Sequence, residues 1–228
     1  ILIMIIVTGA SRGLGKAVTE RLLDSGEEVI GLVRSSNTLN IKSIECDIGD
    51  YSSVKKAARQ VKLMKKPIKA FINAAGVASM NMAVTTDQST VQKVIQTNLI
   101  GTIHCCQLFA PIMLRYKQGS FINFSTIAVP LALKGESVYV ASKAGVEAFS
   151  RTFAREMADF NIRVNCIAPG PIRTDLLRGI TDNQIEKITS QQIIPRQFQK
   201  SDVCNLVELL IDEKASSLSG QVLNIGGV

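Results

Sequence analysis

The amino-acid sequence predicts an α/β fold, in which a doubly wound parallel sheet of about seven strands carries helices on both faces. Short apolar runs alternate with longer stretches of helical periodicity along the whole chain. A glycine-rich turn follows the first apolar run and precedes the first helical stretch, which is the β–turn–α–β order of a parallel sheet. With 228 residues the chain has the size of one domain, so we expect a single domain over 1–228.

The predicted elements alternate regularly. The first apolar run, at 2–7, predicts a buried strand because it breaks at Thr8-Gly9 and is far shorter than the ~18 residues of a membrane span. The expected strands are 2–7, 29–33, 43–46, 70–73, 120–125, 163–168 and 221–225, and the expected helices are 14–23, 51–64, 87–97, 99–116, 137–158 and 201–212. Residues 174–200 are the least regular, and two interpretations stay open for them: a mobile lid over a site or an irregular connection.

The charge of the chain is concentrated in one segment. Hydrophobic residues make up 46% and charged residues 20%, a composition that excludes a largely disordered chain. Lys and Arg number 26 against 19 Asp and Glu, a net charge of +7. Residues 55–69 account for this excess with seven basic side chains and no acidic one: Lys55, Lys56, Arg59, Lys62, Lys65, Lys66 and Lys69. Most of them fall on one helix face, and we favour a solvated surface over the alternative, a docking patch for an acidic partner.

The cysteine and histidine counts exclude several classes of site. Five cysteines, an odd number without a C-x-x-C pair, predict neither a disulfide framework nor a structural zinc site, and a cytoplasmic location fits best. The single histidine, His104, lies in an apolar stretch and is expected to pack in the core. We therefore expect no metal site and no His-based hydrolase. The chain start lacks the features of a signal peptide, and we expect neither membrane nor nucleic-acid binding.

The glycine-rich turn at 8–15 predicts a dinucleotide site in a Rossmann-type fold. Glycines here let the backbone turn tightly and approach a pyrophosphate, and the N-terminus of the next helix offers free N–H groups to phosphate. The spacing is G-x-x-x-G-x-G over Gly9, Gly13 and Gly15, which differs from G-x-G-x-x-G and from a P-loop. A purely structural turn is the alternative, which the position after the first strand disfavours.

The end of the second predicted strand favours NADP over NAD. A carboxylate at this position binds the ribose 2′-hydroxyl of NAD, whereas arginine pairs with the 2′-phosphate of NADP. Here the strand ends in Val33-Arg34-Ser35-Ser36 without a carboxylate, and Arg12 of the glycine turn can reach the same corner. The alternative is that Arg34 is an ordinary solvated residue.

Tyr139 and Lys143 stand four residues apart on a predicted helix, so their side chains share a face. A phenol with a pKa near ~10 needs a nearby cation to act as an acid–base group at neutral pH, and Lys143 is placed to supply it. The Y-x-x-x-K pattern by itself is weak and gains value from the other motifs.

Together these motifs resemble the short-chain dehydrogenase/reductase family. They are the turn 8–15, Asn73-Ala74-Ala75-Gly76, Asn98, the Tyr139/Lys143 pair and Pro169-Gly170, in the family's order and over essentially the whole chain. Within the family the sequence is most similar to the 3-oxoacyl-[acyl-carrier-protein] reductases of fatty acid biosynthesis, including the regions 171–175 and 219–227. The resemblance implies a homo-oligomer, a tetramer or a dimer.

The resemblance also implies catalytic roles for Asn98, Thr126, Tyr139 and Lys143. Tyr139 resembles the general acid of carbonyl reduction, Lys143 the residue that lowers its pKa and holds the nicotinamide ribose, and Asn98 the residue that anchors a water. The family usually has serine where this chain has Thr126, a departure that keeps the hydroxyl but adds a methyl group. Two alternatives stay open: Ser125 takes over the role, or catalysis is impaired.

By the same resemblance, a longer set of residues is expected to bind the cofactor. It comprises Gly9, Ser11, Arg12, Gly13, Leu14, Gly15, Arg34, Asp47, Ile48, Asn73, Ala74, Gly76, Tyr139, Lys143, Pro169, Gly170, Ile172 and Thr174. An acyl carrier protein is acidic, so cations are expected near the mouth of the site, and Lys117 and Arg178 match the positions that carrier-protein reductases use. A solvated surface is an equal alternative for both.

Three hypotheses of function follow. The first is NADPH-dependent reduction of a 3-oxoacyl thioester, linked to acyl carrier protein or CoA, to the 3-hydroxyacyl product. The second keeps the chemistry but takes another small ketone, sugar or alcohol. The third is a non-catalytic cofactor-binding protein with regulatory duties, in which Thr126 marks lost catalysis.

Overall fold

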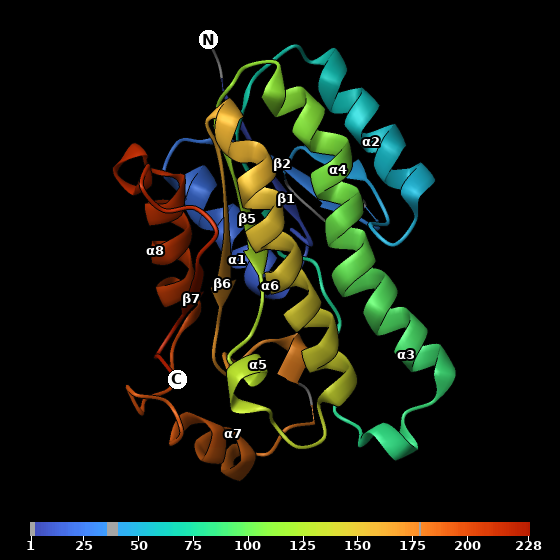
Figure 1. Cartoon of the computed structure of the whole chain (residues 1–228), viewed down its shortest axis with the longest axis vertical. Helices are drawn as coiled ribbons and strands as arrows, with labels where there is room; N and C mark the ends of the chain where they lie inside the picture. The colour runs from blue at the N-terminus through green and yellow to red at the C-terminus, as the bar shows by residue number, and fades with distance from the viewer. Residues whose placement is uncertain (1–2, 36–40, 178) are drawn as a thin grey trace.

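The computed structural model describes residues 3–35, 41–177 and 179–228. Its centre is a parallel sheet with the strand order β3-β2-β1-β4-β5-β6-β7 (Figure 1). The strands are β1 (Met4–Thr8), β2 (Glu28–Val33), β3 (Ser43–Glu45), β4 (Ile68–Asn73), β5 (Gly119–Phe124), β6 (Ile162–Ala168) and β7 (Val222–Asn224). The order reverses between β1 and β4, so the sheet is doubly wound and the predicted fold class is confirmed.

Helices cover both faces of this sheet. They are α1 (Gly13–Asp24), α2 (Tyr51–Leu63), α3 (Gln88–Ile95), α4 (Gly101–Leu114), α5 (Ala128–Leu131), α6 (Ser137–Met157), α7 (Asp182–Thr189) and α8 (Lys200–Ile211). A π-helical segment at Gln96–Ile100 joins α3 to α4, and 3-10 turns lie at Ala83–Thr85, Ala158–Phe160, Asp175–Leu177 and Glu213–Ala215. In Figure 1, α1 and α8 lie on one side of the sheet, and α2, α4 and α6 lie on the other.

The strands are apolar throughout because both of their faces are buried. Along β1, Met4 and Ile6 pack with α2, α4 and α6, while Ile5 and Val7 pack with α1 and α8. This alternation follows the two-residue period of a strand. A strand that is buried on both faces needs apolar residues at every position. Its sequence is therefore a continuous apolar run, which is why these strands could be predicted.

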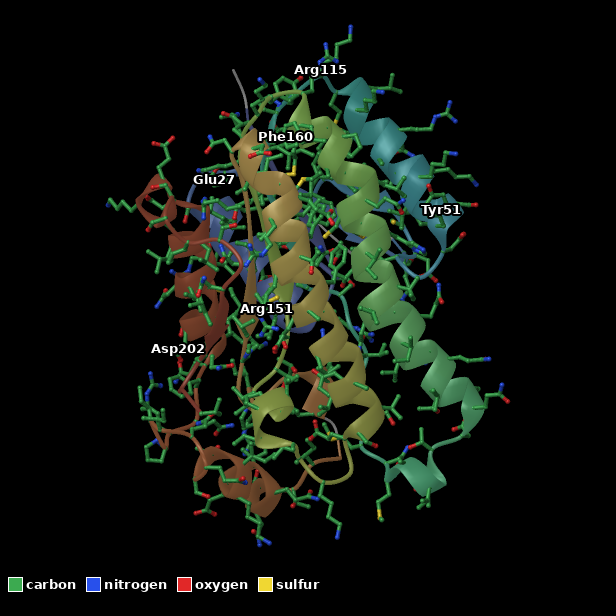
Figure 2. The ribbon with its side chains drawn as sticks, viewed as in Figure 1. Glu27, Tyr51, Arg115, Arg151, Phe160 and Asp202 are labelled. Atoms are coloured by element: carbon green, nitrogen blue, oxygen red, sulfur yellow. The ribbon has the colours of Figure 1, made fainter. Side chains whose placement is uncertain are left out.

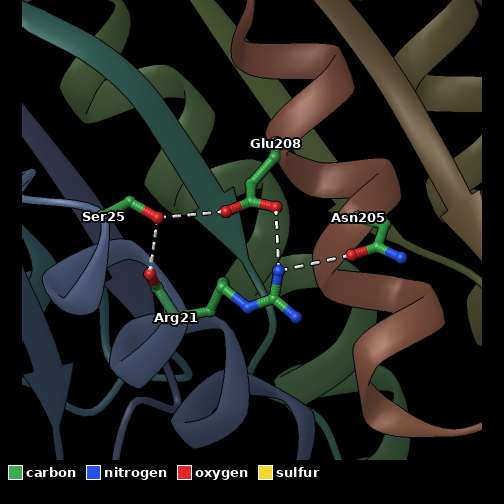
Figure 3. A network of polar contacts seen from close by, with 4 residues as sticks. All are labelled: Arg21, Ser25, Asn205 and Glu208. Carbon is green, nitrogen blue, oxygen red and sulfur yellow. Dashed lines mark hydrogen bonds and ion pairs between the residues drawn. The ribbon is translucent and has the colours of Figure 1, made fainter.

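Polar contacts join α1 to α8 at the edge of their shared apolar surface (Figure 3). The Arg21 guanidinium donates to Glu208 Oε2 at 3.2 Å and to Asn205 Oδ1 at 3.4 Å. Ser25 Oγ donates to Glu208 Oε1 at 3.2 Å. Such partly exposed ion pairs contribute at most about 1 kcal/mol each, so the packing of the two helices carries most of the stability.

The basic segment 55–69 is only partly helical. Helix α2 ends at Leu63, because Lys65 takes a positive φ of 53° and Pro67 follows. Lys66 and Lys69 therefore leave the helix face on which the sequence pattern placed them. The Lys66 ammonium lies 2.5 Å from Glu28 Oε2, and Lys69 pairs with Glu27. Figure 2 shows long side chains of α2 projecting away from the body of the protein.

Residues 174–200 are more regular than predicted. Helix α7 at Asp182–Thr189 begins with a capping box, in which the Thr181 hydroxyl accepts from the Gln184 backbone N–H and the Gln184 side chain accepts from the Thr181 N–H. Within α7 the side chain of Ile185 is buried. The expectation of an irregular stretch was wrong for this helix, because the T-x-x-Q signal at its start was overlooked.

One described helix, Gln88–Leu114, is long and apolar enough to cross a membrane by length and composition. Half of its most apolar window is buried inside the protein. Cys105, Cys106, Phe109 and Met113 are fully buried and belong to the core on one face of the sheet. We therefore interpret it as a core helix.

The histidine and the cysteines are part of the packed interior or its border. His104 packs edge-on against Tyr51, with ring centroids 5.3 Å apart, and its Nδ1 lies 3.2 Å from the Ile48 carbonyl oxygen. All five cysteines are buried and free. Among the described residues, no group of three or more His, Cys, Asp and Glu side chains is arranged to hold a metal ion.

Candidate active site

A cavity of about 710 Å³ opens at the carboxyl ends of the strands, where the strand order reverses. Most of the predicted site residues line it: Gly9, Ser11, Arg12, Gly13, Leu14, Arg34, Asp47, Ile48, Ala74, Gly76, Thr126, Tyr139, Lys143, Pro169, Gly170, Ile172 and Thr174. The fold thus brings together residues that are spread over more than 160 positions of the chain.

Three predicted residues do not line the cavity. Gly15 is a packing residue, since a Cβ there would lie 2.4 Å from the Gly9 carbonyl oxygen. Asn73 is buried and turned inward, where its Nδ2 donates to Asn123 Oδ1 at 2.8 Å. The structure therefore does not place the Asn73 side chain beside an adenine ribose, as the resemblance implied. Asn98, the third, is fully buried behind the cavity wall.

The glycine turn forms a cradle for phosphate. Gly9 has a φ of +68°, and a Cβ there would lie 2.8 Å from Ala75 Cα, so only glycine allows β1 and β4 to approach this closely. Helix α1 starts at Gly13 with no acidic residue in its first turn, and the Arg12 side chain does not cap it. Its first N–H groups and the positive end of its dipole are thus available to an anion.

Two guanidinium groups flank this cradle. Arg12 and Arg34 are both exposed and both line the cavity, together with Ser35. Asp47, the nearby acid at the end of β3, accepts a hydrogen bond from the Gly49 N–H at 2.9 Å. Ser36, the other predicted hydroxyl, lies outside the described residues. This corner therefore combines two cationic side chains with one carboxylate that already has a hydrogen-bond donor.

Tyr139 and Lys143 lie one helical turn apart on α6, and both are buried, with exposed fractions of 8% and 5%. Lys143 Nζ donates to the Phe124 carbonyl oxygen at 2.7 Å. Burial lowers the pKa of Lys143 to about 8. The cavity therefore holds an amine that can change its protonation state near neutral pH.

The pKa of Tyr139 is raised, which differs from the prediction. Burial is the largest cause, the charge of Glu136 adds to it, and a hydrogen bond with the Thr126 side chain acts in the opposite direction. Lys143 is not among the causes of the shift, so the predicted lowering by its charge is not seen. In this state Tyr139 holds its proton firmly, as a proton donor to a carbonyl must before reaction.

The two neighbouring hydroxyls after β5 have different surroundings. Ser125 Oγ donates to the buried carboxylate of Glu147 at 2.6 Å. Thr126 Oγ1 accepts from the Ala128 N–H at 3.2 Å and also contacts the phenol of Tyr139. The alternative in which Ser125 replaces Thr126 is disfavoured, because the Ser125 hydroxyl already has a buried partner.

Asn98 acts as a clamp behind Tyr139 and Lys143. It lies in the π-helical segment, and such bulges re-aim side chains within a helix. Its Oδ1 accepts from the Val77 N–H at 2.8 Å, and its Nδ2 donates to the Val77 carbonyl at 2.8 Å and to Ser142 Oγ at 3.0 Å. Asn98 thereby ties the loop after β4 to helix α6.

The outer part of the cavity was not predicted. Apolar side chains from the 3-10 turn, α7 and neighbouring loops line it: Met80, Leu133, Leu176, Leu177, Ile180 and Ile188. Glu136, at the start of α6, lines it as well. For Leu176, Leu177, Ile180 and Ile188 the only signal in the sequence was their apolar character within the segment 174–200, and the other three residues gave none.

Lys117 does not lie at the mouth of the cavity. It precedes β5, whereas the cavity lies at the opposite, carboxyl end of that six-residue strand, about 20 Å away. Figure 2 shows Arg115, two residues before Lys117, at the far end of the molecule from α5 and α7. Within one chain Lys117 is thus remote from the cavity, its expected docking role stays a prediction, and Arg178 lies outside the described residues.

Comparisons with known proteins agree with this site. Residues 3–185 match the family described as short chain dehydrogenase. A 3-oxoacyl-[acyl-carrier-protein] reductase FabG from Staphylococcus aureus is 31% identical, over 97% of this chain and 96% of the relative, and its namesake from Escherichia coli is 29% identical over 97% and 95%.

Solved structures share the whole fold. A ligand-free aldohexose dehydrogenase from Thermoplasma acidophilum has a TM-score of 0.88 at 29% identity, and the match covers 98% of this chain and 92% of that one. A Brucella melitensis structure described as ribose-5-phosphate isomerase has a TM-score of 0.90 at 28% identity, over 98% and 91%.

The chain belongs to the short chain dehydrogenase family, whose members are oxidoreductases that bind a nicotinamide cofactor, NAD or NADP. Its curated relatives at about 30% identity are named as 3-oxoacyl-[acyl-carrier-protein] reductases. The glycine cradle, the two arginines and the buried Tyr139/Lys143 pair fit such a cofactor on geometric grounds alone.

Proposed function

We propose that this protein reduces the ketone of a 3-oxoacyl thioester to the 3-hydroxyacyl product with NADPH. One observation carries the choice of substrate: the proton-bearing Tyr139 faces a cavity whose outer wall is built of apolar side chains, including Leu133, Leu176 and Ile180. An acyl chain buries its methylene groups favourably against such a wall. The names of the curated relatives support the same substrate class.

The residues divide the work as follows. NADPH, when bound, supplies the hydride. Tyr139 donates its proton to the carbonyl oxygen, and Thr126 donates a hydrogen bond to the same oxygen and so stabilises the charge that develops there. Lys143 lies one turn further along α6 and can return a proton to Tyr139, since its pKa of about 8 lies near neutrality. Asn98 positions both by holding α6 against the loop after β4.

The preference for NADPH rests on Arg12 and Arg34. Both line the cavity, and the strand end at Arg34 carries no carboxylate to accept a ribose 2′-hydroxyl. A 2′-phosphate between two guanidinium groups makes charge-assisted hydrogen bonds, which are about twice as strong as neutral ones.

We also propose a homo-oligomer, a tetramer or a dimer, on the strength of the family resemblance. Size-exclusion chromatography with light scattering tests this assembly, and a monomer at micromolar concentration contradicts it.

A steady-state assay tests the function. Consumption of NADPH is followed with an acetoacetyl thioester, with a panel of other ketones and sugars, and with NADH in parallel. We expect the thioester with NADPH to give the highest kcat/KM. Preferred oxidation of an aldose would favour the second candidate, a sugar dehydrogenase, which the likeness to an aldohexose dehydrogenase supports.

A further inference from the structure

Glu136 places a carboxylate in the candidate active site that has no hydrogen-bond partner among the described residues. Its exposed fraction is 9%, and it lines the cavity one helical turn before Tyr139. No hydrogen bond or ion pair is formed by its side chain within the described parts of the chain. Burial of the side chain raises the pKa of Glu136.

The fold leaves this carboxylate free although several partners lie nearby. Glu136 occupies the N-cap position of α6, yet its side chain does not cap the helix N–H groups. Lys143 donates to the Phe124 carbonyl instead. By contrast, Asp47 in the same cavity accepts from the Gly49 N–H, and Glu147 behind it accepts from Ser125. Among these acids Glu136 alone faces the cavity unpaired.

A carboxylate on a largely buried side chain is usually paired, because withdrawing it from water without supplying a hydrogen-bond donor is unfavourable. The donor that is missing from the protein can come from the substrate. A 3-oxoacyl thioester linked to a carrier protein or CoA has an amide N–H on the arm beyond its sulfur, about six bonds from the ketone carbon. Glu136, at the N-cap of α6, and Tyr139 are one helical turn apart. Tyr139 can therefore face the ketone while Glu136 faces the arm.

We propose that Glu136 determines specificity by accepting a hydrogen bond from the amide N–H of the thioester arm. The inference rests on the proposed function. It adds a reason why a thioester whose arm carries an amide N–H is preferred over a thioester with a plain alkyl arm. A site that holds a polar group for a substrate N–H rejects analogues that lack it, because the group then stays buried and unpaired.

Two substrates test the proposal with the intact protein. S-acetoacetyl-N-acetylcysteamine carries the amide N–H, and the S-pentyl thioester of the same acid has the same chain length with two methylene groups in place of the amide. We expect kcat/KM to be about 10- to 100-fold higher for the first, the range of one hydrogen bond to a charged group. The difference should lie mainly in KM, since the arm is remote from the reacting carbonyl.

Two variants then assign the effect to Glu136. Glu136→Leu should bring kcat/KM for the two substrates to within about threefold of each other. Glu136→Gln keeps an acceptor oxygen of the same size and should retain most of the preference. Should Glu136→Leu fail to fold, the comparison of Glu136→Gln with the wild type on both substrates still measures the contribution of the charge.

The outcomes separate this inference from the proposed function. Equal kcat/KM for the two thioesters in the wild type overturns the role of Glu136 and leaves the reductase intact. An undiminished preference in Glu136→Leu also overturns it. Reduction of neither thioester, together with turnover of another carbonyl compound, overturns both.

Discussion

Removing the hydroxyl of Thr126 should abolish most of the turnover. In the structure this hydroxyl contacts the phenol of Tyr139 and lines the cavity, where it can donate to the carbonyl oxygen of a substrate. A donor aimed at the oxygen on which charge develops contributes about 3–4 kcal/mol to the transition state, so kcat of Thr126→Ala should fall about 100- to 1000-fold. Thr126→Ser keeps the hydroxyl and should stay within about fivefold of the wild type.

The neighbouring residue supplies a matched control. Ser125 also follows β5, but its hydroxyl donates to Glu147 at 2.6 Å. Ser125→Ala should therefore lower the free energy of unfolding by about 1–3 kcal/mol while kcat changes little. The assay is steady-state oxidation of NADPH with an acetoacetyl thioester, alongside urea unfolding of each variant. Full turnover by Thr126→Ala, or a larger loss of kcat in Ser125→Ala, refutes the assignment.

Three further predictions concern the cofactor, the pH dependence and the clamp. Arg34→Ala should raise KM for NADPH about 10- to 100-fold and leave KM for NADH nearly unchanged, and equal effects on both cofactors would contradict the role of Arg34. Folding lowers the pKa of Lys143 from 10.5 to about 8, so the unfolded chain binds more protons between these values and the destabilisation by Lys143 is relieved as pH rises. Urea unfolding should show the stability of the wild type rising relative to Lys143→Met, by about 2 kcal/mol between pH 8 and 10, and a constant difference would contradict the shift. Asn98→Leu should lose about 2–4 kcal/mol of stability, because the Val77 N–H and carbonyl and the Ser142 hydroxyl lose their partner, and an unchanged urea midpoint would exclude the clamp.

The sequence predicted the sheet well because its strands are buried on both faces. Apolar runs such as 29–33 leave no ambiguity between a core strand and a surface one, and each observed strand lies within two residues of its predicted bounds. The glycine turn and the shared helix face of Tyr139 and Lys143 could also be predicted from the sequence, since both depend on local backbone geometry.

Features that depend on tertiary contacts were missed. The π-helical segment that aims Asn98 has no distinct local pattern, and Asn73 turns inward because Asn123 of the adjacent strand offers it a partner. The direction of the Tyr139 pKa shift follows from burial, which no spacing reveals. The position of Lys117 before β5, at the end of the strand opposite the cavity, also depends on the direction of the strand in the sheet.

Product analysis with NADPH and S-acetoacetyl-N-acetylcysteamine tests the central claim most directly. Wild-type protein should convert the ketone to the 3-hydroxyacyl thioester, identified by mass spectrometry, with one NADPH oxidised per product. Tyr139→Phe, which lacks the proton donor, should form it at least about 100-fold more slowly. Equal product from Tyr139→Phe, or no oxidation of NADPH by the wild type with this substrate, would contradict the assignment of the protein as a 3-oxoacyl thioester reductase.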